Sequence, residues 1–422
     1  MNDAPTKIET TDQLKTAVLE IVQSQSIYDI HTHLFSPEFS ELLLWGIDEL
    51  LTYHYLIAEL FRKSDVTYDH FWHMTKTQQA DLIWETLFIE NSPISEACRG
   101  VVTTLNELGL DVTSRNLQEY RQYFADTSVE DFIDTVFNTS NVSNVIMTND
   151  PFDPLEEPVW ETGNIGDTRF EAALRMDVLI NSYDDIAYEH LRALGYDVDL
   201  TLSTDKGYRE VRRFLETWIQ RMNPKYMAVS LPPDFAYPED SVLGRLFDHC
   251  ILPVSREFNV PFALMIGVKR AVNPHLRMAG DGTGKADLSS LETLLREHQD
   301  NKFLVTLLSR ENQHELCVIA RKFKNLMIFG CWWFMNNPSI IEEITRERIE
   351  LLGLSVIPQH SDARILDQLI YKWIHSRQII TDVLIEKYST LLDVGWTLTA
   401  SEIQRDVNNL FGGNFKRFLN NN

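Results

Sequence analysis

The stretch Asp29-Ile30-His31-Thr32-His33 ends an apolar run that begins at Ile27, and it decides how the rest of the sequence is interpreted. In a β-strand, alternate side chains point to the same side, so we expect His31 and His33 to project together from the carboxyl end of a strand. Two imidazoles placed in this way can bind one divalent metal ion. The alternative interpretation is two ordinary histidines in a short strand.

A second apolar run, near the other end of the chain, favours a metal site. This run covers residues 355–363 and contains Asp362. A carboxylate oxygen added to two imidazoles makes a three-ligand site with room for water or substrate. We therefore predict that His31, His33 and Asp362 hold a single divalent metal.

The sequence favours one metal ion rather than two. Many metal-dependent hydrolases built on α/β barrels carry a lysine on strand four and histidines on strands five and six. Here the fourth predicted strand, residues 227–231, has no lysine. Met265 stands on the fifth strand, where a histidine would be sought. A binuclear hydrolytic site is therefore not expected.

Eight short apolar runs read as strands, and from the second onward most are separated by segments with helical periodicity. In residues 207–222, for example, apolar side chains recur at the spacing of one helix face. Alternating strands and helices predict an α/β fold, a (β/α)8 TIM-type barrel. Closure of the barrel makes the first and eighth strands neighbours, which brings the predicted metal ligands to one rim. The predicted strands are residues 27–33, 142–150, 172–178, 226–231, 262–267, 303–308, 326–334 and 355–363.

Residues 35–141 break this alternation. Their pattern is helical, and a structureless loop of that length is not expected in a compact domain. We predict a helical insertion after strand 1, over the carboxyl-end mouth of the barrel, where such barrels build their sites. The predicted organisation is an N-terminal segment with strand 1 (1–34), the insertion (35–141), and the remaining barrel with a C-terminal helix (142–422).

The composition argues against several classes of partner. The 422 residues carry a formal net charge of −24 at pH 7, which disfavours nucleic acid and anionic membrane surfaces. No apolar run approaches the roughly 18 residues of a membrane span, and the N-terminus lacks the apolar core of a signal peptide. The four cysteines are widely spaced, as expected for free thiols. We expect a cytoplasmic protein that binds a small molecule, and the sequence leaves assembly into a homo-oligomer open.

Two arginines are candidates for contact with an anionic substrate. Arg175 lies inside an apolar strand, and Arg364 follows Asp362 by two residues. A guanidinium at either position could bind a carboxylate or stabilise a developing oxyanion. For Arg175, an ion pair with Asp177 is the structural alternative.

Four further candidates each have a chemical and a structural interpretation. Tyr53-His54-Tyr55 could place a phenol over the mouth as a proton donor and acceptor, or pack within a helix. Trp332 and Trp333 could stack on a sugar face or fill the barrel. Ser309-Arg310-Glu311-Asn312-Gln313-His314 could bind substrate or begin a helix, and His360 could orient Asp362 or be a core histidine.

The chain resembles the uronate isomerase (glucuronate isomerase) family of the amidohydrolase superfamily, in its shorter bacterial branch. The HxH motif is typical of the superfamily, whereas the tyrosine and tryptophan segments point to this family. The similarity runs along nearly the whole chain. Its motifs are DIHTHLFSP at 29–37, YHY at 53–55, TNDPFD at 148–153, GCWWF at 330–334 and HSDAR at 360–364.

This resemblance implies an aldose–ketose isomerase that interconverts D-glucuronate with D-fructuronate, and D-galacturonate with D-tagaturonate, through a cis-enediol. It implies Zn2+ on His31, His33 and Asp362, with Asp362 as the base for the C2 proton. Tyr55 or Arg364 would shuttle a proton between the C1 and C2 oxygens, and Arg175 matches a further active-site position of the family.

The chain also departs from the longer members of that family. Met265 stands where they carry a strand-five histidine, which leaves a fourth protein ligand open. Ser361-Asp362-Ala363-Arg364 replaces their Thr-Asp-Ser-Arg. A metal-dependent hydrolase or decarboxylase of another carboxylated small molecule is the alternative function. A non-catalytic sugar-acid-binding protein is a third, and it would not need the metal ligands.

Overall fold

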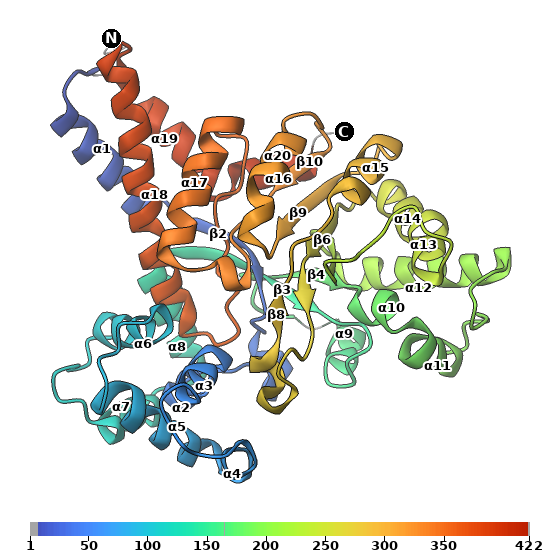
Figure 1. Ribbon diagram of the computed structural model, residues 1–422, viewed down its shortest axis with the longest axis horizontal. Helices are drawn as coiled ribbons and strands as arrows, with labels where there is room; N and C mark the ends of the chain where they lie inside the picture. The colour runs from blue at the N-terminus through green and yellow to red at the C-terminus, as the bar shows by residue number, and fades with distance from the viewer. Residues whose placement is uncertain (1–6, 164, 421–422) are drawn as a thin grey trace.

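One curled parallel sheet of seven strands organises the computed structural model, which describes residues 7–163 and 165–420 (Figure 1). The strand order is β10-β9-β6-β5-β4-β3-β2, and every neighbouring pair is parallel. This is an α/β fold consistent with a TIM-like barrel. The strands are β2 (Ile27–Thr32), β3 (Val142–Asn149), β4 (Phe170–Arg175), β5 (Met227–Leu231), β6 (Phe262–Ile266), β9 (Phe303–Leu307) and β10 (Leu326–Ile328).

The strands are apolar on both faces because each face packs against a different core. In β6, Ala263 and Met265 belong to the cluster inside the curl, together with Ile30 of β2. Leu264 and Ile266 belong to the outer cluster, which also contains residues of the surrounding helices. This alternation explains why the strands appear in the sequence as continuous apolar runs.

The predicted eighth strand is wrong as a regular strand, although its segment lies where it was expected. Residues 355–363 run between β10 and β2 and exchange backbone hydrogen bonds with both. Ile357 N donates to Ile328 O (3.1 Å), and on the other side His33 N donates to Ala363 O (2.7 Å). Pro358 has no N–H to donate, and Asp362 has φ +51°, so regular pairing cannot continue.

Helices follow most of the strands. In α12 (Asp205–Met222), the side chains of Val211, Phe214, Leu215 and Trp218 are buried, as their helical spacing predicted. The others are α9 (Glu157–Thr162), α10 (Asp177–Asn181), α11 (Tyr188–Ala193), α13 (Val242–Leu246), α14 (Leu252–Glu257), α15 (Ser289–Glu297), α16 (Gln313–Ala320), α17 (Pro338–Leu352) and α18 (Gln368–Asp393).

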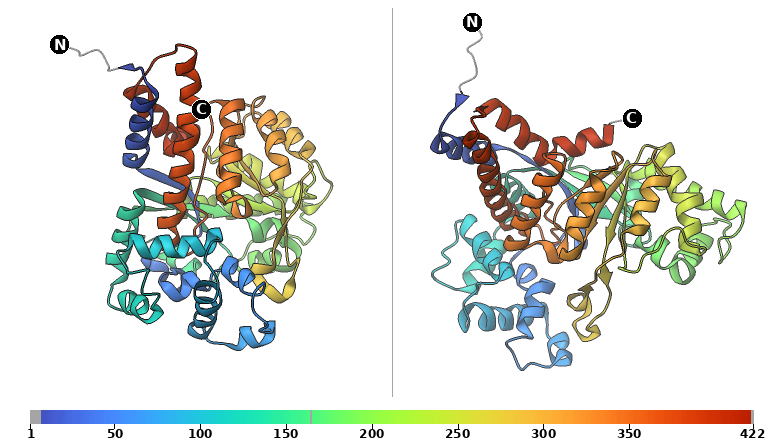
Figure 2. Two further views of the ribbon diagram at one scale, coloured as in Figure 1. Left: turned by 60° about the vertical axis from the view of Figure 1, so that its left-hand side comes forward. Right: turned by 45° about the horizontal axis from the view of Figure 1, so that its top comes forward.

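The chain between β2 and β3 is helical. Its helices gather at one end of the sheet, beside the hairpin of β7 (Val268–Lys269) and β8 (Gly282–Thr283), in both views of Figure 2. Trp72 Nε1 donates to the carbonyl of His275, which joins the two elements (2.8 Å). These helices are α2 (Ile47–Leu51), α3 (His54–Leu60), α4 (Tyr68–His73), α5 (Lys76–Trp84), α6 (Glu96–Glu107), α7 (Leu117–Ala125) and α8 (Val129–Ser140).

The two ends of the described chain meet. β1 (Lys7–Ile8) pairs with β11 (Leu398–Thr399), and α1 (Thr11–Ser24) packs against α18 and α19 (Ala400–Asn408). The predicted closing helix is broken before α20 (Asn414–Asn420), where Gly412 has φ +149° and lies against Tyr28. None of the helices in the described residues is long and apolar enough to cross a membrane.

Candidate active site

His31, His33 and Asp362 come together as the sequence predicted. Their ligand atoms all lie within 4.8 Å of one another. Asp362 Oδ1 lies 3.5 Å from His31 Nε2 and 3.4 Å from His33 Nε2. Strand β2 provides both histidines at its carboxyl end, and the 355–363 segment provides the carboxylate beside it. Within residues 7–163 and 165–420, no fourth His, Cys, Asp or Glu joins this group.

The hydrogen bonds of Tyr226 determine which nitrogen of His31 carries the proton. The Tyr226 hydroxyl donates to Ile30 O (2.8 Å), so its oxygen is left to accept from His31 Nδ1 (3.0 Å). The proton on Nδ1 leaves the Nε2 lone pair facing Asp362. Burial lowers the pKa of His31 to about 3, which keeps the imidazole neutral.

Two buried acceptor atoms therefore face each other without a proton between them. His31 Nε2 and Asp362 Oδ1 both lack a hydrogen-bond partner among the described residues. Burying a lone pair against a carboxylate in this way is costly unless a cation lies between them. Two imidazole nitrogens and one carboxylate oxygen are also a common ligand set of divalent metals. The side chains present thus fit a metal ion.

Asp29 supports the carboxylate segment from the side of β2 that faces α18. Its Oδ1 accepts from Ser361 N (3.1 Å), and its Oδ2 accepts from Trp373 Nε1 (2.8 Å). Burial raises the pKa of Asp29 to about 6. The same aspartate starts the DIHTH motif, so it couples β2 to the segment that carries Asp362.

Two cavities adjoin the three candidate ligands. The triad cavity, of about 40 Å³, is lined by all three of them. The mouth cavity, of about 800 Å³, shares His33, His54, Arg175 and Arg364 with it and extends toward α2–α5. A volume of this size is typical of small-molecule sites.

Both predicted arginines line these cavities. Arg364 has no ion pair among the described residues. Arg175 pairs with Asp177 (Nε–Oδ2 3.2 Å), so the structural alternative is present, yet the guanidinium still lines both cavities. Arg270, which the sequence analysis missed, also lines the triad cavity and pairs with Asp281 (2.6 Å). It directly follows β7, in the connection between β7 and β8, and neither motif spacing nor a surrounding apolar run indicated it in the sequence.

The aromatic candidates line two different cavities, and Trp333 borders both of them. Trp332 and Trp333 line the triad cavity, and both are buried. Tyr55 is not brought to this cavity. It lines a separate rear cavity of about 190 Å³, which Trp333 also borders, and its hydroxyl has no partner in the described chain. His54 of the same segment lines the triad cavity instead.

One solved structure decides the family. A uronate isomerase from Bacillus halodurans C-125 is 57% identical to this chain, with a TM-score of 0.96, and the match covers 98% of each chain. The chain belongs to the uronate isomerase family. The resemblance drawn from the motifs is therefore confirmed, and the isomerase function with it.

More distant uronate isomerases share the fold. A uronate isomerase from Thermotoga maritima is 15% identical with a TM-score of 0.79, over 98% of each chain. A glucuronate isomerase from Caulobacter crescentus is 14% identical with a TM-score of 0.76, over 97% of this chain and 94% of that one. Comparison with family models gives no match, and comparison with curated proteins gives none.

Two other candidates from the sequence, residues 309–314 and His360, make no hydrogen bond to the three candidate ligands in the described part of this uronate isomerase. Arg310 forms a bidentate pair with Glu343 (2.8 and 3.0 Å), and Gln313 donates to Leu307 O (3.1 Å). Residues 309–314 therefore lie at the start of α16, and none of them lines the triad cavity or the mouth cavity. His360 is buried, and its ring packs against Phe329 and against the candidate ligand His31. Neither of its ring nitrogens has a hydrogen-bond partner in the described chain, so its role in orienting Asp362 stays a prediction.

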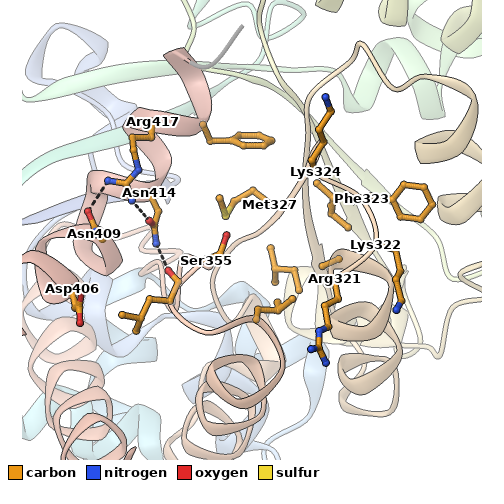
Figure 3. Close-up of a pocket in the computed structure, with 16 residues that line it drawn as sticks. Arg321, Lys322, Phe323, Lys324, Met327, Ser355, Asp406, Asn409, Asn414 and Arg417 are labelled. Carbon is orange, nitrogen blue, oxygen red and sulfur yellow. Dashed lines mark hydrogen bonds between the residues drawn. The ribbon is translucent and has the colours of Figure 1, made fainter. Parts of the chain in front are cut away.

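A further cavity, of about 680 Å³, lies at the amino-terminal end of β10, away from the candidate ligands. Figure 3 shows that its cations do not converge on one point, because Arg321 and Lys324 point in opposite directions. Arg417 donates to the side-chain oxygens of Asn409 (2.7 Å) and Asn414 (2.5 Å). This cavity has no arrangement of groups for the isomerase reaction.

Proposed function

We propose that this enzyme interconverts D-glucuronate with D-fructuronate and D-galacturonate with D-tagaturonate, with one Zn2+ held by His31, His33 and Asp362. The observation that carries the proposal is that His31 Nε2 and Asp362 Oδ1 face each other with no proton between them. This contact lies in a member of the uronate isomerase family. A bound divalent cation would supply Lewis acidity toward the oxygens at C1 and C2 of the sugar.

The chain's own groups account for the proton transfers. In the aldose-to-ketose direction, Asp362 accepts the proton from C2 and returns it to C1, while the proton of the C2 hydroxyl passes to the C1 oxygen by way of Arg364. Together the two transfers move the carbonyl from C1 to C2 through a cis-enediol. Positioned acid–base groups of this kind contribute about 10²–10⁴-fold in rate. Arg364, which lines both cavities, stabilises the charge that develops on the enediol oxygens.

Two arginine side chains in the cavities explain how a protein with a large net negative charge can bind an anionic sugar acid. Arg175 and Arg364 present guanidinium groups to the cavities and are assigned to the substrate carboxylate. Trp332 and Trp333 are assigned to the sugar face, and they exclude water from the reacting carbons. Tyr55 as the proton shuttle stays a prediction, since it lies behind Trp333.

We also propose that residues 35–141 act as a helical insertion over the mouth. Glu49, Tyr53 and Trp72 from this segment line the mouth cavity, which supports that role. Location in the cytoplasm and assembly into a homo-oligomer stay predictions.

The test is to incubate the zinc-loaded protein with each uronate and measure ketose formation. We expect D-fructuronate from D-glucuronate and D-tagaturonate from D-galacturonate, and loss of both products after chelation. Failure to form either ketose would overturn the proposed substrates. Release of CO2 would indicate a decarboxylase instead.

A further inference from the structure

We infer that Lys372 is a positioning residue: its ammonium group holds the backbone of Ser361 and Asp362 so that the Asp362 carboxylate stays aimed at both imidazoles. This inference rests on the proposed metal site. Lys372 lies on α18 and belongs to none of the motifs from which the family was inferred.

The contacts of Lys372 are specific. Its Nζ donates to the carbonyl of Ser361 (2.7 Å) and to the carbonyl of Asp362 (3.4 Å). Only 5% of the residue is exposed. No carboxylate forms an ion pair with it in the described chain, so the two backbone oxygens are its principal hydrogen-bond partners. A buried ammonium is costly, and such groups are retained where they perform a function.

The backbone at Asp362 needs such support. Its φ of +51° is uncommon for residues other than glycine and persists where the surroundings impose it. No strand ladder imposes it, because residues 355–363 are not a regular strand. The Asp362 amide donates to His31 O (3.1 Å), and Lys372 anchors the carbonyl on the other side of the same Cα.

Loss of the ammonium would free this carbonyl and let the Asp362 side chain turn away. The carboxylate oxygen now lies 3.5 and 3.4 Å from the two imidazole nitrogens, so a small rotation removes it from the ligand set. Partners outside the ligands of a metal site typically contribute 10–100-fold in metal affinity or activity, as a rough range.

Chemical rescue distinguishes this role from simple packing. The rear cavity is lined by Lys372, so a small amine can reach the space that Lys372→Ala would open. We expect Lys372→Ala to bind Zn2+ about 10–100-fold more weakly in competition with a chelator, while its circular dichroism stays that of the wild type. Propylammonium should restore much of the affinity, and propan-1-ol, which has a similar shape and no charge, should not.

Lys387→Ala is the matched control, because Lys387 lies on the same helix and pairs at the surface with Glu350 and Glu386. Its zinc affinity should equal that of the wild type. If Lys372→Ala does not fold, Lys372→Gln replaces it, and weaker zinc binding is expected there too.

Unchanged zinc affinity in the Lys372 variant, or equal rescue by propan-1-ol, would overturn the inference. The proposed function is tested separately by the wild type. If wild-type protein binds zinc without forming ketose, the substrates are wrong, while the zinc measurement still decides the role of Lys372.

Discussion

The carboxylate of Asp362 lies between two imidazoles and lines the same cavity as Arg364. In the proposed reaction this carboxylate accepts a proton and returns it. We expect Asp362→Asn to keep the fold, because the amide has the same shape, and to lose about 10²-fold or more in kcat. Ketose formation measures the loss. Asp382→Asn, a change on α18 away from both cavities, is the control. A near-normal kcat for Asp362→Asn would remove Asp362 from the role of base.

The buried carboxyl of Glu156 should make the free energy of unfolding depend on pH. Burial raises its pKa to about 8 from the ordinary value of 4.5, and it accepts hydrogen bonds from Asn149 Nδ2 and Asp150 N. Between these two pKa values, the folded protein binds a proton that the unfolded chain does not, so the stability contributed by Glu156 falls as pH rises.

Glu156→Gln mimics the protonated form and removes this cost. Its free energy of unfolding relative to the wild type should therefore increase from pH 5 to pH 8, by an amount on the order of a few kcal/mol. Urea unfolding of both proteins at the two pH values measures the difference. A difference that stays constant with pH would show that Glu156 is ionised in the folded protein.

The roles of individual residues could be predicted from the sequence to different extents. The two histidines were predictable because a period of two in a strand puts them on one side. Tyr226 and Lys372 were not predictable, since their roles depend on hydrogen bonds to segments far away in the sequence. Tyr55 was assigned through its motif, and no pattern in the sequence tells which of three adjacent side chains faces the cavity.

Gly330, two residues after the end of β10, lies where the buried ring of His360 leaves no room for a side chain. Gly330 has φ +64°, and a Cβ there would lie 1.8 Å from Cδ2 of His360. Gly330→Ala should therefore destabilise the protein by about 1–3 kcal/mol through overpacking, in addition to the cost of the backbone conformation. Denaturant unfolding measures this change.

Gly353→Ala is the matched control, because Gly353 has φ +61° and a Cβ added there would meet no atom within 4 Å. It should show the backbone cost without the clash. Equal destabilisation of the two variants would mean that His360 moves aside without cost.

Seven of the eight predicted strands are present as strands, because apolar β-rich runs and helical periodicity are local signals. Six of them match to within three residues at each end, whereas the strand predicted at 326–334 ends at Ile328. The eighth is irregular for a reason that only the assembled structure shows. Its hydrogen bonds to β2 and β10 replace a regular ladder, and they leave Asp362 free to adopt the left-handed conformation that aims its carboxylate.

Metal binding should stabilise the whole molecule. Because the three candidate ligands come from distant parts of the chain, the unfolded protein does not hold them together, and zinc binds the folded form selectively. At a free zinc concentration 100 times Kd, the expected stabilisation is about 2.7 kcal/mol. Thermal unfolding with zinc and with a chelator measures it, and His33→Ala should abolish the difference. An equal Tm under both conditions in the wild type would contradict selective binding.

The most direct measurement of the central claim is anomalous X-ray scattering at the zinc edge, from a crystal of the zinc-loaded protein. We expect one strong peak within coordination distance of His31 Nε2, His33 Nε2 and a carboxylate oxygen of Asp362. A peak elsewhere, or none in a crystal of active enzyme, would contradict it.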